Sequence, residues 1–213
     1  GNGLGNLDLG GSTTVSGAGD HNLVNLTVNQ NGTLTMASTA GNLVLDGVTL
    51  NNAVAGTINL AGDVTLASSG AGSTLNNAGN LNKSAGTGTA TLGSQIALVN
   101  TGTVTADSGT LNVGGSYTQN GATASTVINT SDSLTTTTLT INDGSLTVIG
   151  TLNAALTNAG TATLSGTHNG NLSNSDTVTV SGTLNGDLTN SATATLSGSQ
   201  TGTVDNSGSL TLS

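Results

Sequence analysis

The side chains that could do acid–base or nucleophilic chemistry are few in this chain, and they are scattered along it. His21 and His168 are the only imidazoles, and no Ser, His and Asp are spaced as a hydrolytic triad would require, although Ser is abundant. Tyr117 is the only aromatic residue, so a groove that holds sugars by stacking is not expected. Because catalysis needs titratable groups brought together, we expect that the protein is not an enzyme and uses no cofactor.

The residues that could bind a metal ion form no recognisable pattern either. All ten acidic residues are Asp, and there is no Cys. A calcium site needs several oxygen ligands at short, regular spacing, but the Asp residues form neither an EF-hand loop nor the Gly-Gly-x-Gly-x-Asp nonapeptide of calcium β-rolls. The lack of Cys excludes disulfides and thiolate metal sites. We therefore expect the Asp residues in turns, where Asp is common, and no metal site.

The charge balance limits the partners that the protein can have. Lys83 is the only basic side chain, and the formal net charge is −9. Such a chain cannot neutralise a phosphate backbone, which excludes nucleic acid as a partner, and it is not attracted to anionic membranes. No apolar run approaches the ~20 residues of a membrane span, so no segment of this chain is expected to insert into a membrane.

The composition and its alternation indicate an all-β protein. The chain has 213 residues, with 33 Gly and no Phe, Trp or Pro, and 33% of its residues are hydrophobic. In segments such as 161–165 and 177–181, Leu, Val and Ala alternate with Thr and Ser. This period of two is typical of half-buried strands and is not expected of a disordered chain. We expect short strands of about three to five residues.

A strict 16-residue repeat fills the C-terminal third of the chain and predicts the architecture. Units 145–160, 161–176, 177–192 and 193–208 align without gaps, and 209–213 begins a fifth unit. So short a unit cannot have a core of its own, and it must stack on its neighbours. We therefore predict a right-handed parallel β-solenoid (β-helix) in which each unit is one turn and equal positions lie about 4.8 Å apart.

One position of the repeat is Asn in every unit, and it predicts a ladder of side chains. In such a ladder each side-chain amide bonds to the amide of the next rung. The alternative is that these residues lie in surface turns, where Asn is common because it bonds to its own backbone. The residues concerned are Asn158, Asn174, Asn190 and Asn206.

Two further positions of the repeat predict the course of the backbone and the environment of a histidine. The sixth residue is always Gly, which we expect at corners where the backbone needs a positive φ; these are Gly150, Gly166, Gly182 and Gly198. The eighth residue varies between apolar and polar, from Leu152 through His168 and Leu184 to Gln200. That tolerance places His168 at a solvated edge rather than in a site.

The upstream part of the chain shows the same pattern with irregular lengths. Segments 75–81 and 98–104 repeat the Leu-x-Asn-x-Gly order of the C-terminal units. We predict longer, less uniform rungs for 23–144, strict rungs for 145–213, and either a loose first rung or a linker for the Gly-rich 1–22. No domain boundary separates these parts, and about twelve rungs would make a rod of about 60 Å.

These segments resemble the repeats of a known class of proteins. Residues 77–88, 99–111, 114–119 and 182–190 are similar to repeats of large secreted bacterial β-helix proteins, the autotransporter passengers and filamentous-haemagglutinin-like adhesins. The resemblance covers about residues 70–213. It implies a β-helix and export from the cell, and it is compatible with adhesins, matrix proteins and filaments alike, because function does not follow from the fold.

Outward-facing Ser and Thr residues give the repeat a regular surface. Positions 1 and 3 would form an array spaced about 6.8 Å along each strand and 4.8 Å between rungs. Some solenoid ice-binding proteins present such an array, so ice binding is an alternative function; the other explanation is that Thr favours strands everywhere in this chain. With Ser145 and Ser209, the array consists of Thr147, Thr161, Thr163, Thr177, Thr179, Thr193, Thr195 and Thr211.

These features together predict an extracellular structural or adhesive rod on the bacterial cell surface. It would be part of a larger surface protein, or it would assemble into a filament or surface layer. The lack of Cys and the single basic residue fit an exported protein. Segment 209–213 has no charge or Pro to protect an open strand edge. The expected partners are therefore a second copy, end to end, or a surface receptor.

Overall fold

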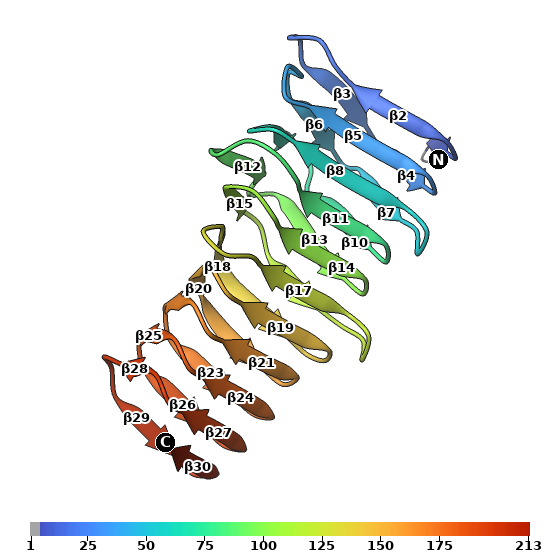
Figure 1. Ribbon diagram of the computed structural model, residues 1–213. Helices are drawn as coiled ribbons and strands as arrows, with labels where there is room; N and C mark the ends of the chain where they lie inside the picture. The colour runs from blue at the N-terminus through green and yellow to red at the C-terminus, as the bar shows by residue number, and fades with distance from the viewer. Residues whose placement is uncertain (1–4) are drawn as a thin grey trace.

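The computed structural model describes residues 5–213, and in these residues the chain forms strands and turns without a helix. The backbone winds as a solenoid whose strands return repeatedly to the same three faces (Figure 1). Strands that stack on one another run parallel. The predicted fold class, an all-β parallel β-solenoid, is confirmed. With no helix in the described residues, none is long and apolar enough to cross a membrane.

The turns of the solenoid build three faces, which we call A, B and C, and most turns contribute one strand to each face. Face A contains β1 (Gly5–Leu9), β4 (Leu26–Gln30), β7 (Thr49–Asn52), β10 (Ser73–Asn77), β13 (Ile96–Asn100), β16 (Tyr117–Gln119), β23 (Leu172–Asn174), β26 (Leu188–Asn190) and β29 (Val204–Asn206). Face B contains β2 (Ser12–Val15), β5 (Thr33–Ala37), β8 (Thr57–Ala61), β11 (Asn80–Lys83), β14 (Thr103–Ala106), β17 (Ser125–Ile128), β19 (Ser145–Val148), β21 (Thr161–Leu164), β24 (Thr177–Val180), β27 (Thr193–Leu196) and β30 (Ser209–Leu212). Face C contains β3 (His21–Val24), β6 (Leu43–Asp46), β9 (Thr65–Ser68), β12 (Thr89–Leu92), β15 (Thr110–Val113), β22 (Thr167–Asn169), β25 (Thr183–Asn185) and β28 (Ser199–Gln200).

Two long strands join faces C and A without a break. β18 (Ser133–Ile141) and β20 (Thr151–Asn158) pass through the corner between these faces, so one 19-stranded sheet covers both of them. They have 9 and 8 residues, longer than the strands that we predicted. Their pairing shifts register between Thr135 and Thr138, which bends the ribbon around the corner.

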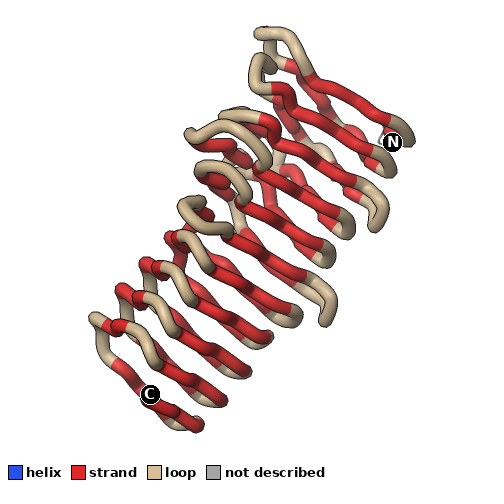
Figure 2. The backbone as a smooth tube through the Cα atoms, viewed as in Figure 1, coloured by secondary structure: helices blue, strands red, loops and turns tan. Residues whose placement is uncertain are grey.

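The rungs become shorter and uniform toward the C-terminus. On face B, Thr33 pairs with Thr57 in an early rung, whereas Ser145 pairs with Thr161 in the C-terminal third, where the step along the chain is shorter. The step of the strict repeat then holds from rung to rung as far as Ser209. The extra residues of the early rungs lie in loops at the corners (Figure 2). The expected change from irregular to strict rungs is therefore present.

The N-terminal segment belongs to the stack where it is described. β1 pairs with β4 and β2 pairs with β5, so these strands form a first rung, while residues 1–4 of the predicted segment lie outside the described residues. Face B has eleven strands, close to the twelve rungs expected. At about 4.8 Å per step, this face is about 50 Å long.

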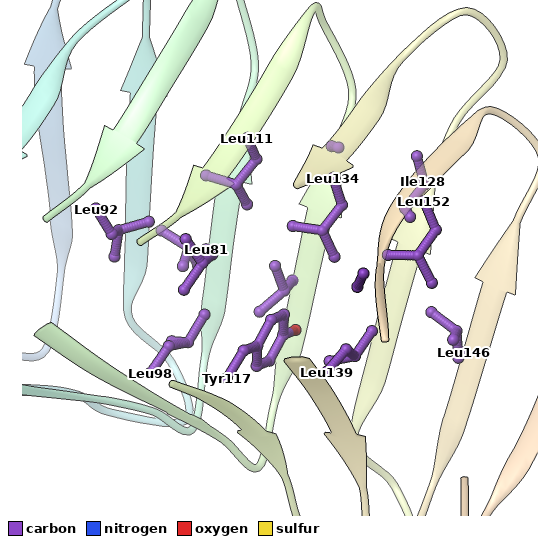
Figure 3. Packing of buried hydrophobic residues seen from close by; sticks show 14 of the residues in the cluster. Leu81, Leu92, Leu98, Leu111, Tyr117, Ile128, Leu134, Leu139, Leu146 and Leu152 are labelled. Carbon is purple, nitrogen blue, oxygen red and sulfur yellow. The ribbon is translucent and has the colours of Figure 1, made fainter. Parts of the chain in front are cut away.

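Inward-facing apolar residues form the core in columns that follow the stack. Along face B, Leu146, Ala162, Val178 and Ala194 succeed one another in register, and each is at most 1% exposed. Figure 3 shows the middle of this core, where Tyr117 lies among leucine side chains. Because every residue of a column has the same kind of neighbour above and below, no large aromatic core is needed.

The repeated Gly at the corner between faces B and C is required by space, and the expectation of a positive φ was wrong. None of Gly150, Gly166, Gly182 and Gly198 has a positive φ. Instead, a Cβ atom on Gly182 would lie 1.9 Å from the carbonyl oxygen of Gly166 in the preceding rung. The backbones of adjacent rungs touch at this corner, and only Gly fits.

The close approach of the backbones at Gly182 and Gly166 predicts that one added methyl group at Gly182 lowers the stability of the protein. Gly182→Ala should destabilise the protein by about 1–3 kcal/mol, because the clash is with backbone and the rungs must move apart. Gly11→Ala is the control, since a Cβ atom there meets nothing within 4 Å. Guanidinium unfolding followed by circular dichroism measures both, and similar midpoints for the two variants would contradict this explanation.

Candidate functional site

The four predicted Asn residues form a hydrogen-bonded ladder inside the corner between faces A and B. Asn158 donates from Nδ2 to Oδ1 of Asn174 at 2.8 Å, Asn174 donates to Asn190 at 2.7 Å, and Asn190 donates to Asn206 at 2.7 Å. The first three are at most 1% exposed. The structure thus places Asn158, Asn174 and Asn190 in the buried interior, and Asn206 continues the ladder at an exposed position of the last rungs.

Each of the three buried amides of this ladder also binds two backbone carbonyl groups at its corner. Nδ2 of Asn174 donates to the carbonyl oxygen of Asp176 at 2.9 Å and to that of Thr193, in the next rung, at 3.0 Å. Asn158 and Asn190 make the equivalent pairs of bonds. The ladder therefore closes the turn within one rung and ties that turn to the following rung.

The ladder continues upstream, beyond what the sequence predicted. Asn52 donates to Asn77 at 2.7 Å, Asn77 to Asn100 at 2.8 Å, and Asn100 to Oε1 of Gln119 at 3.2 Å. The Leu-x-Asn-x-Gly segments pointed to Asn77 and Asn100. Asn52 and Gln119 were missed, because a longer corner follows each of them and Gln does not match the pattern.

An apolar residue interrupts the ladder between its two parts. Ile141 pairs with Gln119 on one side and with Asn158 on the other. The longer Gln119 side chain reaches the next rung, where Nε2 donates to the carbonyl oxygens of Asp143 at 3.2 Å and Ser145 at 3.0 Å. At the gap, Gln119 thereby makes the bonds to backbone carbonyl groups that the Asn residues make elsewhere in the ladder.

The only aromatic residue belongs to this same buried cluster. The Tyr117 hydroxyl bonds to Oγ1 of Thr126, which donates to Oε1 of Gln119 at 2.7 Å. Burial raises the pKa of Tyr117 well above its ordinary value, with a small opposing effect from the bond to Thr126. Tyr117 is neutral and 1% exposed, so it is part of the core and not of a ligand-binding surface.

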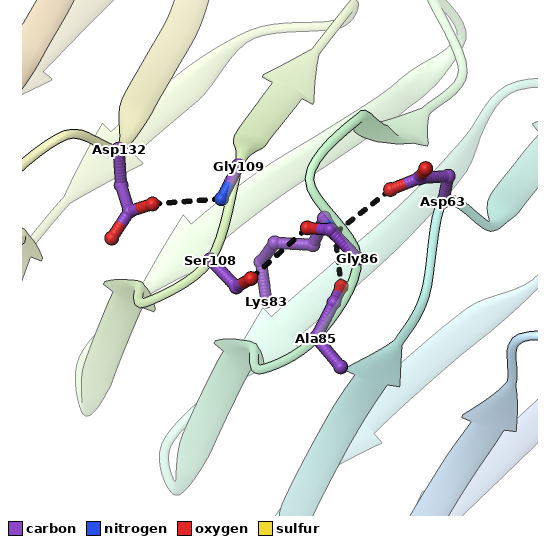
Figure 4. A network of polar contacts seen from close by, with 7 residues as sticks. All are labelled: Asp63, Lys83, Ala85, Gly86, Ser108, Gly109 and Asp132. Carbon is purple, nitrogen blue, oxygen red and sulfur yellow. Dashed lines mark hydrogen bonds and ion pairs between the residues drawn. The ribbon is translucent and has the colours of Figure 1, made fainter.

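The only basic side chain is also buried. Lys83 occupies an inward position of β11, and its Nζ atom bonds to Oδ1 of Asp63 at 3.2 Å and to the carbonyl oxygens of Ala85 and Gly86 (Figure 4). Asp63 belongs to the preceding rung and Ser108 of the following rung also bonds to Gly86, at 3.0 Å. The ammonium group therefore joins two rungs at their loops, and the Ser108 hydroxyl ties the third rung to the same carbonyl group of Gly86.

His168 is buried, and the expectation that it lies at a solvated edge was wrong. It faces inward from β22, between Leu152 of β20 and Leu184 of β25, and it is 0% exposed. Neither ring nitrogen has a hydrogen-bond partner. Burial lowers the pKa of His168 from its ordinary value of 6.5 to about 4, and the nearby backbone of Asn171 and Leu152 opposes this only in part. The tolerance of position 8 reflects an adaptable core, not contact with solvent.

The predicted Ser and Thr array lies on the outer side of face B. Thr161, Thr177 and Thr193 pair in one row, with Ser145 before them and Ser209 after them. A second row, one period of the strand away, contains Thr147, Thr163, Thr179, Thr195 and Thr211. All these side chains are exposed or half-exposed, so the structure places the array where a partner could contact it.

Titratable groups are otherwise spread over the corners. In residues 5–213, no three side chains of His, Cys, Asp or Glu are close enough to hold a metal ion. The carboxylates bind neighbouring backbone instead: Asp132 accepts a bond from the amide of Gly109 at 2.7 Å, and Asp46 from that of Ala71 at 2.6 Å. The exposed Asp187 carboxylate accepts two bonds from Thr203, which lower its pKa.

The ladder predicts that replacing a buried Asn by Ala lowers the stability of the protein much more than replacing an exposed Asn of an adjacent turn. Asn174→Ala should cost about 1–3 kcal/mol, because buried carbonyl and amide partners lose their bonds. Asn185→Ala should cost much less, because Asn185 lies on the exposed side of β25, where water replaces its 2.8 Å bond to Asn169. Denaturant unfolding of both variants tests this, and equal losses would show that the buried ladder is not a special source of stability.

His168 predicts a dependence of stability on pH. Well above pH 6.5 the imidazole is neutral in both states and has no effect on stability. As the pH falls from 6.5 toward 4, the imidazole of the unfolded chain becomes protonated while that of the folded core stays neutral. The free energy of unfolding should therefore fall by on the order of 3 kcal/mol over this range. His168→Leu, which copies Leu152 and Leu184, should remove this part of the pH dependence; an unchanged pH profile in that variant would contradict the assignment.

A comparison of the chain with models of protein families, with curated proteins and with solved structures finds no match. Function has therefore to be inferred from the molecule's own features. These are a stack bonded from rung to rung by a buried ladder, and one outer face with a regular array of hydroxyl groups.

Proposed function

We propose that this chain is a structural rod of an extracellular bacterial surface protein, and that it displays or forms an adhesive surface. The observation that carries the proposal is the unbroken stack: face B pairs strand to strand from β2 to β30, with one continuous core beneath it. A solenoid in which each rung touches only its neighbours is an extended, semi-rigid spacer. A rod of this shape holds groups attached to its two ends at a distance from each other.

The distribution of charge supports a role outside the cell. The one Lys is 0% exposed, so trypsin-like proteases find no accessible basic residue in the described part of the folded chain. The formal net charge of −9 makes separate rods repel one another, and this repulsion is weakest where two uncharged faces meet. The lack of Cys makes the fold independent of the redox state of its surroundings.

The resemblance of residues 70–213 to repeats of secreted β-helix adhesins supports the same proposal. In such a protein the rod would be exported and would hold a binding surface away from the cell. The partner would be a surface receptor or a second copy of the chain. The Thr, Ser and Asn residues that dominate the outer faces are able to make many weak polar contacts.

Surface display of the chain tests this proposal. The chain would be placed between an N-terminal epitope and an outer-membrane anchor in a non-adherent bacterium, with a Gly/Ser linker of equal length as the control. We expect an antibody to reach the epitope above the cell envelope, and we expect cells with the rod to adhere to surfaces or to each other more than cells with the linker. If epitope access and adhesion are the same for rod and linker, the proposal is wrong.

A further inference from the structure

Ser and Thr pairs are concentrated on the outer side of face B along the whole rod, well beyond the strict repeats. Eight of its eleven strands carry Ser or Thr followed two residues later by Thr, both facing outward. The pairs are Ser12/Thr14, Thr33/Thr35, Thr103/Thr105, Ser145/Thr147, Thr161/Thr163, Thr177/Thr179, Thr193/Thr195 and Ser209/Thr211. The three other strands present Thr57 with Asn59, Asn80 with Asn82, and Ser125 with Val127.

The other two faces do not share this pattern, although Thr is frequent throughout the chain. Many of their strands combine an outward Thr with Asn, as in Thr49/Asn51 of β7 and Thr183/Asn185 of β25, and others have no outward Thr, as in Val44/Asp46 of β6. Within the described strands of these two faces, the outward Ser/Thr-x-Thr pair occurs only at Thr89/Thr91 of β12 and at Ser133/Thr135, Thr135/Thr137 and Thr138/Thr140 of β18. If Thr served only to favour strands, the pairs would be spread evenly over the three faces.

Face B is also the face without charge. No outward residue of its eleven strands is Asp or Lys, although the chain carries ten Asp. Asp8 and Asp205 face outward on face A, Asp46 ends β6 on face C, and the remaining carboxylates lie at corners. A charged group orders water strongly around itself, so a charge-free face leaves the water above it free to follow the spacing of the hydroxyl groups.

The geometry of the array is regular in two dimensions. The row Thr163, Thr179, Thr195 and Thr211 advances one rung at a time without a register shift. The spacing is about 4.8 Å between rungs and about 6.8 Å along each strand. Because Thr is β-branched, its hydroxyl and methyl groups are held in few rotamers. Figure 1 shows the strands β19, β21, β24, β27 and β30 lying side by side along one side of the rod.

We propose that face B binds ice. Its rows of hydroxyl and methyl groups repeat in two directions at distances close to those between water molecules in the ice lattice, and the hydroxyl groups can donate and accept bonds as lattice water does. An uncharged, rigid array can hold an ordered layer of water that merges with an ice surface. This activity goes beyond the structural role proposed above, and neither requires the other.

Ice assays on matched surface variants test the proposal. The chain would be measured for thermal hysteresis, for inhibition of ice recrystallisation and for incorporation into a growing ice shell. Thr163→Lys places a long, charged side chain in the array on β21, whereas Thr157→Lys places the same side chain on face A of β20. Both parent residues are exposed, so both variants should fold.

We expect the wild-type chain and Thr157→Lys to be active in all three assays, and Thr163→Lys to lose most of the activity with an unchanged unfolding midpoint. Thr179→Lys provides a second test on the neighbouring strand if Thr163→Lys does not fold. The proposal is overturned if the wild-type chain is excluded from ice and shows no hysteresis, or if the face A and face B variants lose activity equally. The adhesion assay on displayed cells is performed above freezing, so failure of one function is distinguishable from failure of the other.

Discussion

The buried amide groups at the corner between faces A and B bond to the next rung as well as to their own turn, so their bonds are complete only when adjacent rungs are in register. An unpaired amide in the interior costs about twice what a made bond contributes. A rung that slipped by one residue would leave Asn174 or Asn190 without their partners in the next rung and would turn the apolar residues outward. The rows of face B are in register because the interior permits no other alignment. The ladder and the apolar columns together therefore keep the outer array in register.

The same constraint explains where the rod tolerates variation. Early rungs add residues at the corners, as in the loops around Val54 and Gly121, while the inward columns and the ladder positions keep their register. Where Ile141 breaks the ladder, the longer Gln119 side chain and the bond between Tyr117 and Thr126 provide a local substitute. The corner at Gly182 has no such freedom, because the backbones of adjacent rungs already touch there.

The sequence predicted the features that depend on local repetition. The period of two, the strict repeat unit and the invariant Asn identified the strands, the stack and the ladder of residues 158–206. The sequence did not predict the environment of residues whose contacts come from other rungs. The mixture of apolar and polar residues at position 8 suggested a solvated edge, yet His168 lies in the core. The repeated Gly suggested a positive φ, yet the reason for it is contact between rungs. The concentration of Ser and Thr on one face was invisible until irregular rungs were placed in register.

Exchange of side-chain amide protons tests the central claim most directly. If the ladder fixes the register, the Nδ2 protons of Asn174 and Asn190 are bonded in the interior and should exchange with deuterated water only when rungs open, far more slowly than those of Asn169 and Asn185 on the exposed side of face C. Assigned NMR spectra of the folded chain would measure all four residues in one experiment. Strong protection of Asn174 and Asn190 alone is the predicted result. Equally fast exchange at all four residues would contradict the claim that a buried ladder holds the rod together.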